Sequence, residues 1–203
     1  MRTTVAERGL RVVPGRFARD NPPAARENHL TSVRNRDDFQ RIFLPHLDAA
    51  YNLARWLLKN DADAQDVVQE AFLRALRFSG GFRGGDARAW LLAIVRNAAY
   101  SFIARKHPAG VDPNFDEGLR PEPSAPPDIE AIRRADARAL HAALDQLPAE
   151  FREMIVLRDL EELSYKEMAA VADLPIGTVM SRLARARARL KAALGKSQRG
   201  DAK

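Results

Sequence analysis

Residues 163–194, LSYKEMAAVADLPIGTVMSRLARARARLKAAL, constrain the fold of this chain more than any other segment. Ser164 and Glu167 have the spacing of a capping box, which predicts that a helix begins directly after Ser164. The run Asp173-Leu174-Pro175 ends that helix, and Pro175 fits the first position of a second one, where its missing amide hydrogen costs little. The stretch therefore predicts two helices joined by a tight turn.

The second of these helices has two chemically different faces. On a wheel of about 100° per residue, one side is apolar and consists of Val179, Leu183, Ala186, Leu190 and Leu194. A glycine, hydroxyl groups and guanidinium groups lie on or beside the opposite side, at Gly177, Thr178, Ser181, Arg182, Arg185 and Arg189. Such a face fits the major groove of DNA, because arginine binds guanine edges or phosphates and serine and threonine bind either. A solvated arginine-rich surface helix has the same pattern, but the cap and the turn favour DNA binding.

Composition limits the class of protein. The 203 residues suffice for one large or two small domains, and the net charge of +6 favours an anionic partner such as nucleic acid. The absence of cysteine excludes disulfides, thiolate zinc sites and a thiol nucleophile. No apolar run approaches the ~20 residues that span a bilayer, and the N-terminus lacks a secretory signal. We therefore expect a soluble cytoplasmic protein without a membrane span.

Changes in composition divide the chain into five segments. Residues 1–35 are rich in arginine and lack lasting periodicity, which predicts a disordered basic arm. Residues 108–128 contain six prolines, and five acidic residues outnumber the single Arg120, so we predict an acidic, proline-rich linker. Residues 36–107 and 129–195 have helical periodicity, and residues 196–203 are a frayed tail. The predicted fold class is all-α, with two small helical domains joined by a flexible linker.

Within the first domain, the helix DAQDVVQEAFLRALRF has an unusual outer face. That face contains charged and polar residues around one leucine. Its candidate binding residues are Asp66, Gln69, Glu70, Leu73 and Arg74, and Arg77 lies at its end. An exposed leucine among charges suits the centre of a protein interface with a charged rim. A single surface leucine is also common in proteins, and on this observation alone both interpretations stay open.

The next two segments suggest contact with unpaired nucleic acid. The loop SGGFRGGD, residues 79–86, combines four glycines with Phe82 and Arg83, either of which can stack on a base. The helix after it has Arg96, Asn97 and Tyr100 on the side opposite its apolar stripe. An exposed aromatic ring beside an arginine suits single-stranded or partly melted nucleic acid. A plain flexible connector and an ordinary helix surface are the alternatives.

Three stretches in a fixed order resemble the extracytoplasmic-function (ECF) sigma factors, the smallest members of the sigma-70 family. They are DAQDVVQEAFLRAL, DARAWLLAIVRN and the segment from LDQLPAEF through LSYKEMAAVADLPIGTVMSRLARARARL. The resemblance covers about residues 37–107 and 130–194. It implies a sigma region 2-like bundle, a sigma region 4-like helix-turn-helix domain, and a protein without enzymatic activity. The implied function is to direct core RNA polymerase to promoters in response to stress or the environment.

The resemblance also implies a role for each face. The helix with Leu73 would dock on the clamp coiled coil of RNA polymerase. The loop 79–86 and the face with Tyr100 would capture the −10 element, with a base flipped into a pocket. The helix that begins near Pro175 would enter the major groove of the −35 element, and the linker would run toward the RNA exit channel. Further implied partners are the polymerase flap and an anti-sigma factor.

Two other classes of protein share parts of this pattern. A repressor or activator would use the same DNA-reading helix but would need a dimer to read two half-sites, and no heptad zipper is visible. An enzyme would need a constellation of reactive groups. The four histidines His29, His46, His107 and His141 are scattered and lack carboxylates at metal-ligand spacing, so we predict no catalytic residue, metal ligand or cofactor.

Overall fold

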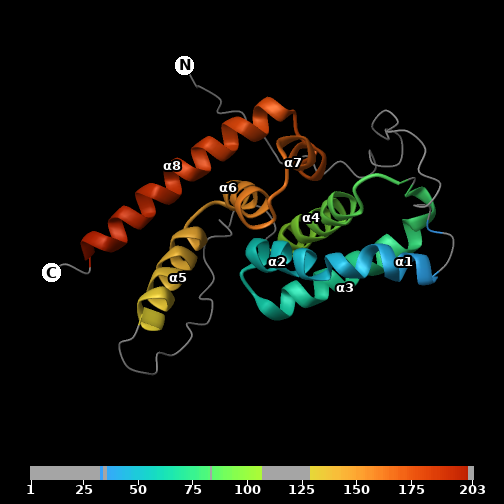
Figure 1. Cartoon of the computed structure of the whole chain (residues 1–203), viewed down its shortest axis with the longest axis horizontal. Coiled ribbons are helices and arrows are strands. Elements are labelled where there is room, and N and C mark those ends of the chain that lie inside the picture. Colours follow the sequence, from blue (N-terminus) through green and yellow to red (C-terminus); the bar gives the residue numbers. More distant parts are fainter. Residues whose placement is uncertain (1–32, 34–35, 83, 107–128, 201–203) are drawn as a thin grey trace, which may run out of the picture.

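The computed structural model describes residues 33, 36–82, 84–106 and 129–200. Within these ranges all regular structure is helical, in agreement with the predicted all-α class, and it forms two packed units (Figure 1). The predicted linker lies outside the described residues, as do Arg83 and all of the predicted arm except Val33. None of the described helices is long and apolar enough to cross a membrane.

The first unit consists of α1 (Arg36–Phe43), α2 (Leu47–Leu58), α3 (Asp61–Phe78) and α4 (Ala87–Lys106), with a 3₁₀ turn, η1 (Leu44–His46), between α1 and α2. Helices α2, α3 and α4 pack against one another. Lys59 ends α2 in the left-handed conformation with φ of 58°. Asn60 then caps α3, because its side-chain oxygen accepts a hydrogen bond of 3.0 Å from the amide of Asp63.

An aromatic cluster joins the loop after α3 to the core of this unit. The ring centroid of Phe82 lies 5.3 Å from that of Phe43 and 5.4 Å from that of Trp90, and Phe82 is only 4% exposed. A short turn, η2 (Ser79–Gly81), directs Phe82 inward, and the loop then turns at Gly85 with φ of 100°, where a side chain would be strained. The predicted stacking of Phe82 on a base is therefore not possible in this conformation.

The second unit consists of α5 (Ile129–Asp145), α6 (Ala149–Ile155), a π-helical turn η3 (Val156–Leu160), α7 (Tyr165–Ala172) and α8 (Ile176–Gly200). The predicted capping box at the start of α7 is present: the amide of Glu167 donates to Ser164 Oγ and the amide of Ser164 donates to Glu167 Oε2. Asp173 ends α7 in the left-handed conformation. Helix α8 begins at Ile176, one residue later than predicted, because the carbonyl of Pro175 accepts its first hydrogen bonds. The helix-turn-helix is therefore confirmed.

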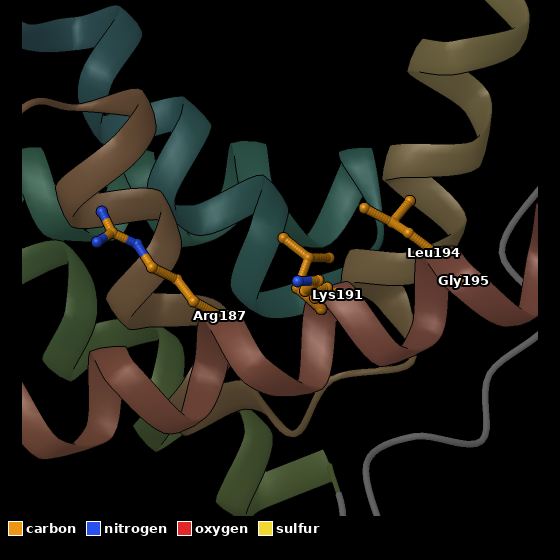
Figure 2. A pocket seen from close by; sticks show the side chains of 5 residues that line it. Arg187, Lys191, Leu194 and Gly195 are labelled. Carbon is orange, nitrogen blue, oxygen red and sulfur yellow. The ribbon is translucent and has the colours of Figure 1, made fainter.

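Helix α8 enters the core with its first half only. Val179, Leu183 and Ala186 are buried, as the wheel predicts. Leu190 and Leu194 are only half-buried, because the helix continues past the core. There they line an open groove of about 430 Å³ together with Arg187, Lys191 and Gly195 (Figure 2). Its lining of apolar and basic side chains has no acid–base pair of the kind that catalysis requires.

Helix α4 is the element that the two units share. Buried side chains surround it on nearly all sides and include Leu91, Leu92, Ala93, Val95, Ala98 and Ala99. Helices α2 and α3 cover one side, and α7 packs against it from the other unit, while α6 packs against α2 (Figure 1). A helix that is apolar all round belongs in the interior. The two units are therefore docked, and α4 lies between them.

The position of Phe82 gives a test of the first unit. We expect Phe82→Ala to lower the free energy of unfolding by about 3 kcal/mol, because it removes a ring from a packed core. Phe78→Ala is the matched control, since this neighbouring ring is 66% exposed and its loss should change stability by less than ~0.5 kcal/mol. Urea unfolding followed by circular dichroism measures both, and equal midpoints would contradict the core position of Phe82.

Candidate nucleic-acid and protein interfaces

The structure brings together the five predicted residues on the outer face of α3. Asp66, Gln69 and Leu73 are exposed, with Leu73 at 51%. Glu70 pairs with Arg74 on the same helix and lies 3.6 Å from Arg105 Nη2 of α4. This face points away from α6 and α7 (Figure 1). The apolar part is larger than predicted, because Leu76, one turn further along α3, is also exposed.

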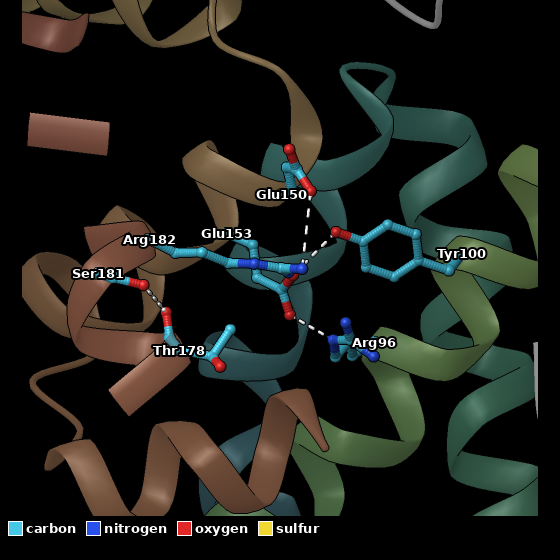
Figure 3. Close-up of polar contacts among 7 residues, drawn as sticks. All are labelled: Arg96, Tyr100, Glu150, Glu153, Thr178, Ser181 and Arg182. Carbon is cyan, nitrogen blue, oxygen red and sulfur yellow. Dashed lines mark hydrogen bonds and ion pairs between the residues drawn. The ribbon is translucent and has the colours of Figure 1, made fainter. Parts of the chain in front are cut away.

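The six predicted residues on α8 do not all face solvent. Gly177 and Arg185 are exposed and Ser181 is partly so. Arg182 lies toward α6, with Nη2 3.9 Å from Glu150 Oε2 (Figure 3). Thr178 is half-buried, and its backbone carbonyl accepts a hydrogen bond from Ser181 Oγ. Arg189 is exposed, and its guanidinium lies 4.6 Å from the ring centre of Phe151.

Two apolar residues at the start of α8 were missed by sequence reasoning. Met180 is 51% exposed, and Ile176 is exposed one turn before it. Both lie beside the apolar stripe on the helical wheel, so periodicity alone predicts that they are buried. The helix-turn-helix geometry is the signal that could have found them, because the first turns of the second helix project from the domain.

On α4, the structure separates Asn97 from the other two predicted residues. Asn97 is exposed, whereas α6 of the second unit covers Arg96 and Tyr100. The carboxylate of Glu153, which is 0% exposed, pairs with Arg96 and accepts a hydrogen bond of 2.8 Å from the Tyr100 hydroxyl (Figure 3). The guanidinium of Arg96 also lies 4.7 Å from the centre of the Tyr100 ring. One buried carboxylate thus holds both donors.

The electrostatics of this cluster determine which groups are charged. Burial raises the pKa of Tyr100 well above its ordinary value, and the negative charge of Glu153 raises it further, so the phenol stays neutral and donates. Burial alone would lower the pKa of Arg96, but the charge and hydrogen bond of Glu153 raise it above the ordinary value. The guanidinium is therefore charged at every accessible pH.

A second buried carboxylate makes an equivalent contact between the units. Glu161, directly after η3, pairs with Arg88 of α4 and accepts a hydrogen bond of 3.3 Å from Asn52 Nδ2 of α2. Lys59 Nζ donates to the carbonyl of Asp145 at 2.6 Å. The ring of Trp56 stacks on His141 with centroids 4.7 Å apart. Docking of the units therefore combines charge, hydrogen bonding and ring stacking.

Arg152, next to Glu153 in the chain, lacks a good partner. It is 1% exposed, and its Nε and Nη1 atoms make no hydrogen bond. Nη1 lies 3.5 Å from Asp145 Oδ1, which is close enough for an ion pair but outside hydrogen-bonding geometry. Burial lowers the pKa of Arg152, and the charge of Asp145 offsets this only in part. A buried charge with such weak compensation costs several kcal/mol.

The structure therefore defines a two-unit helical protein whose second unit contains a helix-turn-helix with exposed basic residues. Residues 42–108 match sigma-70 region 2, and residues 137–190 match sigma-70 region 4. The chain belongs to the sigma-70 family of transcription initiation factors, in its ECF group. Members of this family are not enzymes.

Three relatives show the extent of the similarity. The ECF sigma factor SigE of Mycolicibacterium smegmatis is 37% identical over 154 residues, which cover 74% of this chain and 59% of the relative. The sigma-H factor of Pseudomonas aeruginosa is 39% identical and covers 65% of this chain and 73% of the relative. The ECF sigma-E factor of Escherichia coli is 37% identical, with 62% and 70% covered.

Two solved structures have a similar fold. The sigma factor RpoE in complex with the anti-sigma factor NepR, from Bartonella quintana, superposes with a TM-score of 0.64 and 31% identity, over 78% of this chain and 98% of that one. CnrH in complex with the cytosolic domain of CnrY superposes with a TM-score of 0.58 and 29% identity, over 83% and 94%.

Proposed function

We propose that this chain is a dissociable sigma factor that directs core RNA polymerase to specific promoters in the bacterial cytoplasm. The observation that supports this most is the presence of both matched regions in one chain, in the order that places a polymerase-binding and strand-capturing unit before a helix-turn-helix. The proposed partners are core polymerase, promoter DNA and an anti-sigma factor. The last is supported by the similar sigma factor RpoE, which was solved in complex with the anti-sigma factor NepR.

In this proposal the outer face of α3 binds the clamp coiled coil of the polymerase. Leu73 forms its apolar centre, and Asp66, Gln69, Glu70 and Arg74 form the charged rim. The exposure of Leu73 supports this, because nothing in the described part of the chain covers it. A charged rim around an apolar anchor is typical of a protein interface that forms and dissociates.

Helix α8 reads the −35 element in this proposal. Gly177 and Arg185 are exposed on its outward side, Ser181 is partly exposed, and the three reach base edges or phosphates. Arg182 and Arg189 reach phosphates at the rim of the groove. The ion pair of Arg182 with Glu150 is long and partly exposed, so exchanging it for a phosphate costs little.

The −10 strand is captured by α4 and the loop before it. Asn97 is already exposed, while Arg96 and Tyr100 supply a cation and an aromatic face once α6 leaves them. Phe82 supports the loop from inside the core rather than touching a base. Recognition and strand capture involve no covalent step, and the phosphate contacts make binding dependent on salt.

The α3 face can be tested with purified core polymerase. We expect Leu73→Glu to abolish run-off transcription from promoters selected out of a random library, because a carboxylate would be buried at the centre of the polymerase contact. Leu140→Glu is the matched control, since this leucine of α5 is also exposed. Circular dichroism checks that both variants fold. Normal transcription by Leu73→Glu would remove the α3 assignment.

The basic face of α8 can be tested on the same promoters. We expect Arg182→Ala combined with Arg185→Ala to weaken binding to the −35 element by about tenfold or more, because two arginine contacts are lost. The slope of log affinity against log salt concentration should also become shallower by about two, one for each lost phosphate contact. Equal affinity and equal transcription across the promoter panel would contradict the assignment of α8 as the recognition helix.

Met180 gives a more specific test of base reading. An exposed methionine on the recognition helix suits contact with the methyl group of thymine. We expect replacement of one −35 thymine by deoxyuridine to reduce the affinity of the wild-type chain about fourfold, as for one buried methyl group. The same replacement should leave Met180→Ala unaffected. Equal losses in both proteins at every thymine would show that Met180 does not contact a methyl group.

A further inference from the structure

We infer that Glu153 occupies, on the face of α4, the place of a nucleic-acid phosphate, so that docking of the second unit and capture of a DNA strand exclude each other. The identity of the competing ligand rests on the proposed function. The docking contact itself rests on the structure alone. In this docked arrangement the chain binds its own acidic side chain in place of DNA.

The chemistry of the contact supports this exchange. Glu153 accepts from the guanidinium of Arg96 and from the hydroxyl of Tyr100. An anionic oxygen between a guanidinium and a second donor is the arrangement in which proteins bind phosphate. Because Glu153 is fully buried against them, Arg96 Nε and the Tyr100 hydroxyl are occupied while α6 remains in place.

Glu161 makes a second contact of the same kind, nearer the start of α4. It engages Arg88, two helical turns before Arg96, and its side chain is almost completely buried. The two arginines and Tyr100 lie on the side of α4 that meets the second unit, and each of them binds a carboxylate from that unit. Arg88 and Arg96 are about 12 Å apart along the helix axis, so one strand that runs along α4 can contact both arginines through separate, non-adjacent phosphates.

Arg152 acts in the opposite direction. In the docked arrangement its guanidinium is buried with two unsatisfied nitrogens, and it interacts electrostatically with Tyr100 of α4. We therefore expect separation of the units to expose it to water. Two consecutive residues of α6 therefore have opposite effects on the docking equilibrium, since Glu153 favours docking and Arg152 favours separation. This predicts that substitutions at the two positions shift the equilibrium in opposite directions.

The outer face of α3 stays accessible throughout. It lies on the side of α2 and α4 away from the second unit (Figure 1), and Leu73 is exposed while the units are docked. A protein partner can therefore bind α3 before the units separate. The docked arrangement covers the strand-binding face without covering the proposed polymerase face.

Fluorescence energy transfer in the full chain measures docking directly. The chain has no cysteine, so the exposed positions Arg77 in α3 and Ala192 in α8 can be replaced by cysteine and labelled with donor and acceptor. We expect Glu153→Gln to shift the ratio of docked to separated molecules by about tenfold or more toward separation. Arg152→Met should raise the docked fraction. Glu162→Gln is the matched control, because this neighbouring glutamate is exposed, and it should leave transfer unchanged.

Binding of a random-sequence single-stranded DNA pool tests the competition. Glu153→Gln should bind the pool several-fold more tightly than wild type at the same ionic strength, and Arg152→Met should bind it more weakly. Adding Arg96→Ala to Glu153→Gln should remove the gain, because the cation that the strand would contact is lost.

The inference is overturned if Glu153→Gln leaves energy transfer unchanged, or if it separates the units without any gain in DNA affinity. Promoter-directed transcription by the wild-type chain with core polymerase distinguishes this failure from failure of the proposed function. Normal transcription together with unchanged transfer in Glu153→Gln overturns only the docking inference, whereas absence of transcription from every selected promoter overturns the proposed function.

Discussion

The carboxylate of Glu153 is the interaction on which the arrangement of the two units depends. A fully buried charge is tolerated only where its partners are close and correctly oriented, and here those partners are Arg96 and Tyr100 of the other unit. This requirement determines the register of α6 on the first unit and thereby the position of the helix-turn-helix that follows it. Apolar burial around α4 supplies attraction without direction, whereas the ion pair selects one docked geometry.

Helix α4 has two roles in the docked chain, one inside the first unit and one in the contact with the second. It is the packing centre of the first unit through Leu91 and Val95, and it presents Arg88, Arg96 and Tyr100 toward the second. A helix enclosed from both sides cannot at the same time hold a DNA strand. Helix α3 has no such conflict, since its outer face is free in the docked chain. The two proposed binding faces of the first unit are thus accessible in different arrangements of the chain.

Local features of the sequence predict much of this structure, and long-range contacts account for what they miss. The capping box at Ser164 and Glu167 and the exposure of Leu73 depend on residues within one or two helical turns, and both are present. The pairing of Arg96 with Glu153 joins residues 57 positions apart, and periodicity identifies a polar face without saying what covers it. The burial of Phe82 differs from the prediction for a related reason. The glycines around it suggest an open loop, but a short turn directs the ring inward.

The neighbouring Arg152 shows why the docked arrangement can be reversible. To change a two-state equilibrium from 1:99 to 99:1, a partner must favour one state by about 5.5 kcal/mol. If Glu153 and Glu161 acted alone, separating the units would leave their carboxylates and the arginines of α4 without partners in a partly opened interface, and the barrier would be large. Release of the poorly paired Arg152 guanidinium into water returns several kcal/mol in the same step. The free-energy gap therefore falls into the range that a ligand selective for the separated arrangement, such as a DNA strand on α4, can supply.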